Sequence, residues 1–233
     1  MSRAALAQGA REAAGVPAAV LAAGYMGFGA LAAGNGLPLA YAVASTLTIW
    51  ALPGQLMLVE AATLGAPFVA IVLTVALSSA RFLPMTLVLM PLMRHARHRG
   101  WHYYLAAQLL ALTGWTAAMV RLPDIERAER LAWFYGFATV CLGASALATA
   151  AGYLVADLLT PLARAGLVFM APMYYLLILL GAIRDRVVAV ALACGAILGP
   201  LAHLVTPQWS VLAGGLIGGT LAWLIVRGAR RRG

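Results

Sequence analysis

The chain has 233 residues, of which 64% are hydrophobic and 10% are charged, and its formal net charge is +9. A soluble domain of this length cannot bury so much apolar surface, so the composition excludes a soluble globular protein and indicates an integral membrane protein. All sixteen basic residues are arginine and lie mostly between uncharged runs. This placement favours positive-inside topology signals over a nucleic-acid surface.

Long uncharged runs separated by charges, glycines and prolines predict an all-α, polytopic helical bundle. Each run is long enough for the about 20 residues that one crossing needs. We expect a single transmembrane domain over residues 1–233, with a cytoplasmic segment at 1–14 and a basic cytoplasmic tail at 227–233. The predicted helices cover about 16–34, 37–64, 67–93, 102–121, 131–153, 163–183, 187–204 and 210–226.

The arginines test this arrangement, because positively charged loops favour the cytoplasm. With eight crossings, eleven loop arginines lie on the side of both termini and four lie on the other side, namely Arg94, Arg97, Arg99 and Arg164. The split favours cytoplasmic termini, but the basic cluster RHARHRGWH at 94–102 then lies outside. A re-entrant segment among the first three helices would bring that cluster inside and leave seven crossings. Both counts remain open.

Two predicted helices are interrupted in their interiors. The second reads TIWALPGQLMLVE, where Pro53 removes a helix hydrogen bond and Gly54 relaxes the backbone. The sixth reads LVFMAPMYYLLILL, with Pro172 in mid-span. Broken helices in corresponding parts of two halves indicate a transporter's binding site, because unwound backbone can hold polar groups. An ordinary proline kink is the alternative at Pro172.

Arg81 lies in the middle of the apolar run LTVALSSARFLPMTLVLM. An arginine at the centre of a bilayer costs roughly 2.5 to 3.5 kcal/mol, so it needs a reason. If the second and third helices form a hairpin near Gly65, Arg81 lies roughly 23 Å from the turn. Pro53 and Gln55 lie roughly 19 and 16 Å from the same turn. The arginine and the predicted break therefore share a depth.

This shared depth predicts a site for a substrate carboxylate. A guanidinium grips a carboxylate with two parallel hydrogen bonds, and the half-helix that starts at Gly54 offers free N–H groups. The candidate substrate-binding residues are Arg81, Pro53, Gly54, Gln55, Ser79 and Pro172. In the alternative interpretation, Arg81 is bonded by backbone carbonyls and ties helices together.

Glu60 is the other charged residue inside a predicted span, roughly 8 Å from the same turn. This depth argues against an ion pair with Arg81. Glu60 is a candidate for proton coupling, because desolvation near an apolar boundary raises a carboxyl pKa. A carboxylate that faces headgroups or a loop arginine is the equal alternative.

The remaining motifs give little evidence for metal binding or catalysis. His95, His98 and His102 have helical spacing, but no Cys, Asp or Glu accompanies them, so we expect a solvated basic surface and no metal. No G-x-S-x-G or H-E-x-x-H motif is present, which argues against an enzyme, and no cofactor is expected.

Three GxxxG pairs favour close helix packing, within the chain or with a partner. They lie in the last two predicted helices and are Gly195 with Gly199, Gly214 with Gly218, and Gly215 with Gly219.

Three segments in order carry a resemblance to a known family, namely GVPAAVLAAGYMGFGALAAGNGLPLAYAVAST, then ALPGQLMLVEAATLGAPFVAIVLTVALSSARFLP, then GLVFMAPMYYLLILL. Their order and spacing resemble the AzlC-type branched-chain amino-acid permeases. Gln55 and Arg81 match the family's glutamine and arginine, and Ser79 stands where the family has asparagine. Gly166, Phe169 and Pro172 match a late G-L-D-F-x-x-P element.

Other positions depart from the family pattern, and three acidic positions are lost. Pro53-Gly54 replaces Ala-Ser and Phe82 replaces histidine, while Thr113-Gly114-Trp115 replaces Thr-Asp-Glu and Val168 replaces aspartate. The missing carboxylates are natural candidates for ion coupling or for the substrate ammonium.

The resemblance implies export of branched-chain or other small hydrophobic amino acids across the bacterial cytoplasmic (inner) membrane. It also implies a small four-helix membrane partner of the AzlD type. A non-transporting membrane scaffold or assembly subunit is the alternative, favoured by the missing acids and the GxxxG faces.

Overall fold

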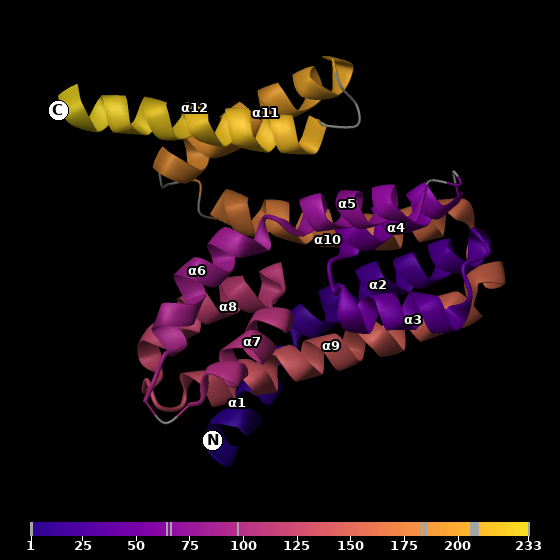
Figure 1. Cartoon of the computed structure of the whole chain (residues 1–233), viewed down its shortest axis with the longest axis horizontal. Helices are drawn as coiled ribbons and strands as arrows, with labels where there is room; N and C mark the ends of the chain where they lie inside the picture. The colour runs from indigo at the N-terminus through magenta and orange to yellow at the C-terminus, as the bar shows by residue number, and fades with distance from the viewer. Residues whose placement is uncertain are drawn as a thin grey trace. The chain divides into compact units, whose positions relative to one another are not determined.

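The computed structural model describes residues 2–63, 65, 67–96, 98–181, 183, 186–205 and 210–232. Every regular element in these ranges is a helix, as the all-α prediction requires. The chain divides into two compact units, Met1–Ala171 and Pro172–Gly233, and each is described by itself (Figure 1).

Helices α2 (Val16–Gly34) and α9 (Arg130–Leu154) form the frame of the first unit. Both are long and apolar enough to cross a membrane, with a hydropathy of 1.6 each. The helices predicted at 16–34 and 131–153 are therefore confirmed. Helix α1 (Arg3–Ala13) lies in the segment predicted as cytoplasmic and also packs on α9.

Four glycines bring the backbone of α9 against α1 and α2. A Cβ atom added at any of them would lie 2.0 Å from a carbonyl oxygen of the facing helix. Gly9 and Gly136 form one pair, and Gly29 and Gly152 form the other. Residue numbers rise together along both sides of the contact, so α1 and α2 run parallel to α9. The facing carbonyls belong to Leu6, Met26, Trp133 and Thr149.

The segment predicted as one helix at 37–64 is a hairpin of two half-length helices, α3 (Leu39–Thr48) and α4 (Leu52–Thr63). The Gln55 amide donates to Ser45 Oγ at 2.9 Å and to Thr46 Oγ1 at 3.1 Å. In one continuous helix these groups would lie roughly 13 to 15 Å apart along the axis. The chain therefore reverses at residues 49–51.

The position of the break corrects the prediction that Pro53 and Gly54 interrupt a helix. Both residues lie in the first turn of α4, where proline is tolerated because the first N–H groups have no helical partner. The reversal precedes them at Trp50, whose φ is +41°. Helix α3 runs antiparallel to α9, because Thr46 contacts Thr149 while Trp50 contacts Ser145.

Helices α5 (Phe68–Ser79) and α6 (Phe82–Met93) replace the helix predicted at 67–93. A Cβ atom at Gly54 would lie 3.8 Å from Ser79 Oγ, so α5 runs back along α4 from the turn at Gly65, which has a φ of +68°. The predicted hairpin near Gly65 is confirmed. After a break at residues 80–81, α6 continues to the N-terminal end of α9, where Arg130 Nη1 donates to Leu92 O at 3.0 Å.

Helices α7 (Gly100–Gln108) and α8 (Leu112–Arg121) form a second hairpin, although the sequence predicts one crossing at 102–121. His102 and Gly114 would lie roughly 18 Å apart in one helix. Both instead lie beside one part of α9. Tyr135 Oη donates to His102 O at 2.7 Å, and a Cβ at Gly114 would lie 3.7 Å from the Phe134 ring. The chain reverses at residues 109–111.

The two hairpins enter the first unit from opposite ends. Figure 1 shows α3 along the C-terminal half of α9, with α4 beside α5, and shows α7 and α8 along the N-terminal half of α9. The 94–102 loop meets the segment that follows α8, since His98 Nε2 lies 3.4 Å from Ala128 O. Two short 3-10 turns, η1 (Leu122–Asp124) and η2 (Ala156–Leu158), flank α9.

Three helices complete the chain, namely α10 (Pro161–Gly181), α11 (Arg186–Val205) and α12 (Ser210–Arg232). The prediction that Pro172 interrupts its helix is wrong, because α10 continues through it. Mid-helix proline removes one hydrogen bond, and the rest of the helix persists. In the second unit α11 and α12 pack antiparallel, and a Cβ at Gly218 would lie 3.7 Å from the Gly195 nitrogen. Gly214 and Gly215 have no described side-chain environment.

Candidate functional site

The two hairpin tips meet beside the middle of α9. The Gln108 side chain, at the end of α7, donates to Thr48 O, at the end of α3. Carbonyls at a helix C-terminus lack helical partners, so this bond satisfies one of them and joins the hairpins. The break at 80–81 lies next to the same region, because Ser79 faces Gly54.

A buried polar network fixes the first tip to α9. Trp50 Nε1 donates to Ser145 Oγ at 3.2 Å, and the hydroxyls of Thr46 and Thr149 lie 3.0 Å apart. All four side chains are buried. A bulky residue with positive φ is strained, and the bond from the indole helps to hold this conformation.

Gln55 is the centre of this network and is fully buried. Its amide nitrogen donates to Ser45 and Thr46, whose hydroxyls in turn donate to Ala42 O, at 2.8 Å for Ser45 and 3.2 Å for Thr46. Because the Ser45 proton is used in this way, the nitrogen of Gln55 must face the hydroxyls. Its carbonyl oxygen, Oε1, is buried without a hydrogen-bond partner among the described residues. A buried acceptor of this kind is costly and suits a donor from a ligand or a water.

The N-termini of three helices also lie beside the two hairpin tips. Helices α4, α6 and α8 each begin directly after one of the three breaks. Neither α6 nor α8 has a side-chain cap on its first turn. Uncapped first turns present free N–H groups and the positive end of the helix dipole, which favours an anion.

The structure brings some of the predicted substrate-binding residues together. Gly54 and Gln55 are buried in α4, Pro53 is exposed in its first turn, and Ser79 faces Gly54. Arg81 follows Ser79 by two residues at the N-cap of α6. Its guanidinium carbon lies 5.2 Å from the centre of the Phe82 ring, and the side chain is exposed.

Two predicted residues lie apart from this cluster. Glu60 is exposed in the second half of α4, towards the Gly65 turn, as its predicted depth requires. Its role in proton coupling stays a prediction. Pro172 lies in the second unit, and its side chain is outside the described residues.

The histidines follow one another along the 94–102 segment. The ring centres of His95 and His98 are 6.1 Å apart, and those of His98 and His102 are 5.9 Å apart. Among the described residues, no group of three His, Cys, Asp or Glu side chains is placed to hold a metal.

Sequence reasoning missed the residues that fix the hairpin tips. They are Ser45, Thr46, Trp50, Gln108, Ser145 and Thr149. The available signal was the polar run AST and the tryptophan shortly before Pro53, in an otherwise apolar segment. Polar side chains inside membrane spans usually serve packing or function.

A salt bridge ties the N-terminal segment to the end of the second hairpin. Arg121 donates to the Glu12 carboxylate through Nε at 3.0 Å and Nη2 at 2.6 Å. The hydrogen bond from Arg121 holds the pKa of Glu12 below its ordinary value of 4.5. The bridge also places residues 1–14 and the 121–130 loop at the same end of the unit, in agreement with the predicted topology.

We expect this bridge to make stability depend on acid pH. Because the pKa of Glu12 is lowered in the folded state, its contribution is present near neutral pH and is lost as pH falls below about 5. A Glu12→Gln variant should therefore lose thermal stability at neutral pH and show a smaller further decrease on acidification than the wild type. Thermal melts at about pH 7 and about pH 4 measure this, and equal acid sensitivity in both proteins would contradict it.

The family model described as AzlC protein matches residues 17–159, which is more than half of the chain and includes both hairpins. The chain belongs to the AzlC family. No curated protein and no solved structure matches it. AzlC proteins form a membrane permease-type family, so this chain is a membrane protein related to transport, as the sequence resemblance predicted.

Proposed function

We propose that this AzlC-family chain is a secondary transporter that exports a small hydrophobic amino acid across the bacterial cytoplasmic membrane. The observation that carries the proposal is the meeting of two opposed half-helix hairpins beside Gln55, whose buried carbonyl oxygen has no hydrogen-bond partner in the described part of the chain. Secondary transporters bind substrates where discontinuous helices end near the middle of the bilayer. Irregular backbone at that depth is tolerated only where it is buried or lines a cavity.

The chemistry of this region suits both ends of an amino acid. Arg81 and the uncapped first turns of α6 and α8 favour the substrate carboxylate. Gln55 Oε1 is an acceptor for the substrate ammonium. Such an acceptor offsets part of the loss of the family's acidic residues at Gly114, Trp115 and Val168.

We propose a membrane topology in which both hairpins are re-entrant. In the described part of the first unit, α2, the pair α5 and α6, α9 and the start of α10 then traverse the bilayer. The α1 end of the unit then carries seven described arginines and the opposite end carries Arg164 alone. Such a split strongly favours a cytoplasmic α1 end. The seven are Arg3, Arg11, Arg94, Arg99, Arg121, Arg127 and Arg130.

This topology replaces the choice between eight and seven crossings. If α10, α11 and α12 each cross once, the chain makes six crossings and both termini are cytoplasmic. Glu60, at the outer end of α4, remains the candidate for proton coupling, and an AzlD-type small membrane protein remains the proposed partner.

Counterflow in proteoliposomes tests the function. Vesicles containing the chain and its AzlD-type partner are loaded with one unlabelled amino acid, and uptake of the same labelled amino acid is measured with and without a pH gradient. We expect exchange of valine, leucine and similar residues and little exchange of charged amino acids. Absence of exchange for every amino acid, in a complex that co-purifies stably, would favour the scaffold.

A further inference from the structure

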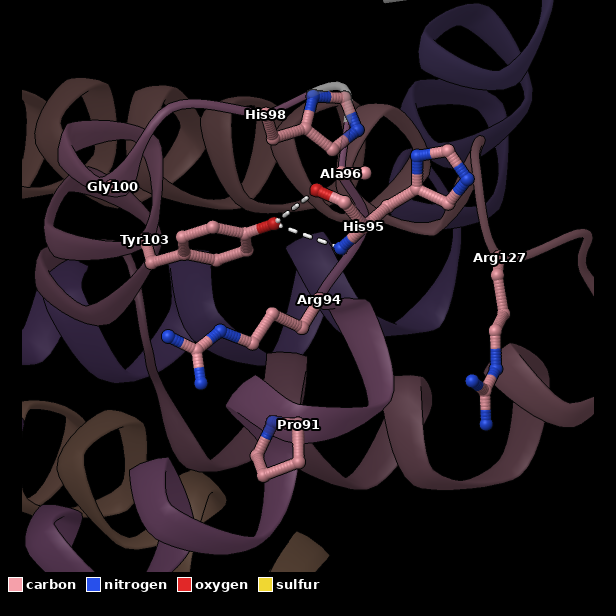
Figure 2. Close-up of a pocket in the computed structure, with 8 residues that line it drawn as sticks. All are labelled: Pro91, Arg94, His95, Ala96, His98, Gly100, Tyr103 and Arg127. Carbon is pink, nitrogen blue, oxygen red and sulfur yellow. Dashed lines mark hydrogen bonds between the residues drawn. The ribbon is translucent and has the colours of Figure 1, made fainter.

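A cavity of about 530 Å³ lies at the end of the first unit where α6 ends and α7 begins. Its lining combines residues between Pro91 and Tyr103 with one residue that follows α8. Figure 2 shows Tyr103 reaching the backbone of His95 and Arg94 extending past the Tyr103 ring, while Arg127 stands apart on a separate segment with its guanidinium directed away from these side chains. We call this cavity the basic pocket. Its lining residues are Pro91, Arg94, His95, Ala96, His98, Gly100, Tyr103 and Arg127.

The frame of the basic pocket is held by hydrogen bonds that leave its arginines available. The Tyr103 hydroxyl accepts from His95 N at 3.0 Å and donates to His95 O at 3.2 Å. His98 Nε2 lies 3.4 Å from Ala128 O, which joins the two segments. Within the part of the chain that the structure describes, neither Arg94 nor Arg127 forms an ion pair.

The charge of the lining favours an anion. Two arginines and two histidines line the pocket, and none of the lining residues is acidic. The nearest acids in sequence, Glu126 and Glu129, flank Arg127 but do not line the cavity. Arginine is especially suited to phosphate, because its planar fork of donors matches two phosphate oxygens.

Two exposed aromatic side chains near this pocket are typical of the level of lipid headgroups. Trp101 and Tyr104, in the first turn of α7, are 53% and 81% exposed. Exposed Trp and Tyr concentrate at membrane interfaces, where an apolar ring meets a polar boundary. The pocket also lies beside the C-terminal end of α6 and the N-terminal end of α9. In the proposed topology these are the points where the chain leaves the bilayer.

We propose that the basic pocket binds a phosphate-bearing anion, supplied by an anionic phospholipid headgroup or as free phosphate. Basic pockets at the cytoplasmic ends of membrane helices bind such headgroups through their phosphate charge. The site joins the 94–102 loop to Arg127, so an occupant bridges the start of the second hairpin and the segment that follows it.

Thermal melts of the purified full chain in a non-ionic detergent test this site. The probes are a short-chain phosphatidylglycerol, a phosphatidylcholine of equal chain length and inorganic phosphate. We expect phosphatidylglycerol to raise the Tm saturably, because a ligand that binds only the folded state stabilises it. Each arginine near an anionic group contributes about fivefold to affinity, so the double variant Arg94→Gln/Arg127→Gln should bind about thirtyfold more weakly.

Two matched variants distinguish the pocket from general surface charge. Arg99→Gln removes an exposed arginine from the same loop that does not line the cavity, and should leave the affinity unchanged. Arg94→Lys/Arg127→Lys keeps the charge and should restore most of the binding. Saturable stabilisation by phosphatidylglycerol alone identifies a lipid headgroup, and equal stabilisation by inorganic phosphate identifies a free anion. No stabilisation by either probe, or the same stabilisation in the Gln double variant, would overturn the proposal.

Discussion

Replacing Gly152 with leucine is expected to destabilise the protein severely. A Cβ atom at this position would lie 2.0 Å from Met26 O, so α2 and α9 must separate along their contact. Overpacking in a well-packed core typically costs 1 to 3 kcal/mol, and a clash with backbone lies at or above the upper end. A cost of about 3 kcal/mol lowers the Tm of a chain of this size by about 6 to 12 °C.

The matched control is Gly143→Leu in the same helix, because a Cβ at Gly143 meets nothing within 4 Å. Leucine has a higher helix propensity than glycine, so this variant should melt at or above the wild-type temperature. Size-exclusion profiles and thermal melts of both variants, purified in parallel, measure the difference. Equal Tm values for the two variants would show that α2 and α9 do not approach at this glycine.

Replacing Arg81 with alanine is expected to abolish substrate exchange while the protein still inserts. Hydrogen bonds to charged groups contribute about 1.5 to 3 kcal/mol, which corresponds to about a 10- to 100-fold loss of substrate affinity. Arg81→Lys keeps the charge but loses the bidentate geometry. Its substrate affinity should therefore lie between those of the wild type and Arg81→Ala. Counterflow measures the exchange, and Arg99→Ala serves as the control for a lost arginine elsewhere.

A structural role for Arg81 makes a different prediction. If Arg81 only ties helices together, Arg81→Ala should lower the Tm without substrate, and the remaining folded protein should exchange normally. If it binds the substrate carboxylate, the Tm without substrate should change little and the stabilisation by valine or leucine should disappear. Unchanged counterflow in Arg81→Ala would exclude a role in substrate binding.

The long helices of the first unit could be predicted because an uninterrupted apolar run of this length forms a single helix in a membrane. Residues 16–34 and 131–153 are uninterrupted apolar runs of crossing length, and both fold as single helices. The hairpin near Gly65 could also be predicted, because Gly and Pro residues mark a turn between two apolar runs. Its glycine has the positive φ that this residue adopts without strain.

The half-length hairpins could not be read from apolar runs alone. A run of 20 to 28 residues, such as 102–121 or 37–64, has the same composition as one crossing helix or as two half-helices. The choice depends on contacts between distant parts of the chain, such as Trp50 with Ser145 and Gln108 with Thr48. The basic cluster at 94–102, which eight crossings place outside, was the sequence signal that favoured a re-entrant segment.

The candidate site could be predicted in part, as the fold could. Proline and glycine after the apolar run identified the region of Gln55, and the predicted hairpin register brought Arg81 to the same depth. In the structure Ser79, two residues before Arg81, faces Gly54. The exact break depended on Trp50, whose positive φ no local rule predicts. Pro172 was misleading, because a proline inside a long apolar helix removes only one hydrogen bond.

The side of the membrane on which the 94–102 loop lies tests the opposed hairpins most directly. Single cysteines at Ala96 and at Thr160, both exposed, are introduced into a variant without Cys141 and Cys194, and intact cells are treated with a membrane-impermeant thiol reagent. With two re-entrant hairpins, Thr160→Cys should be labelled in intact cells and Ala96→Cys only after permeabilisation. Labelling of both positions in intact cells, as eight crossings require, would contradict the account.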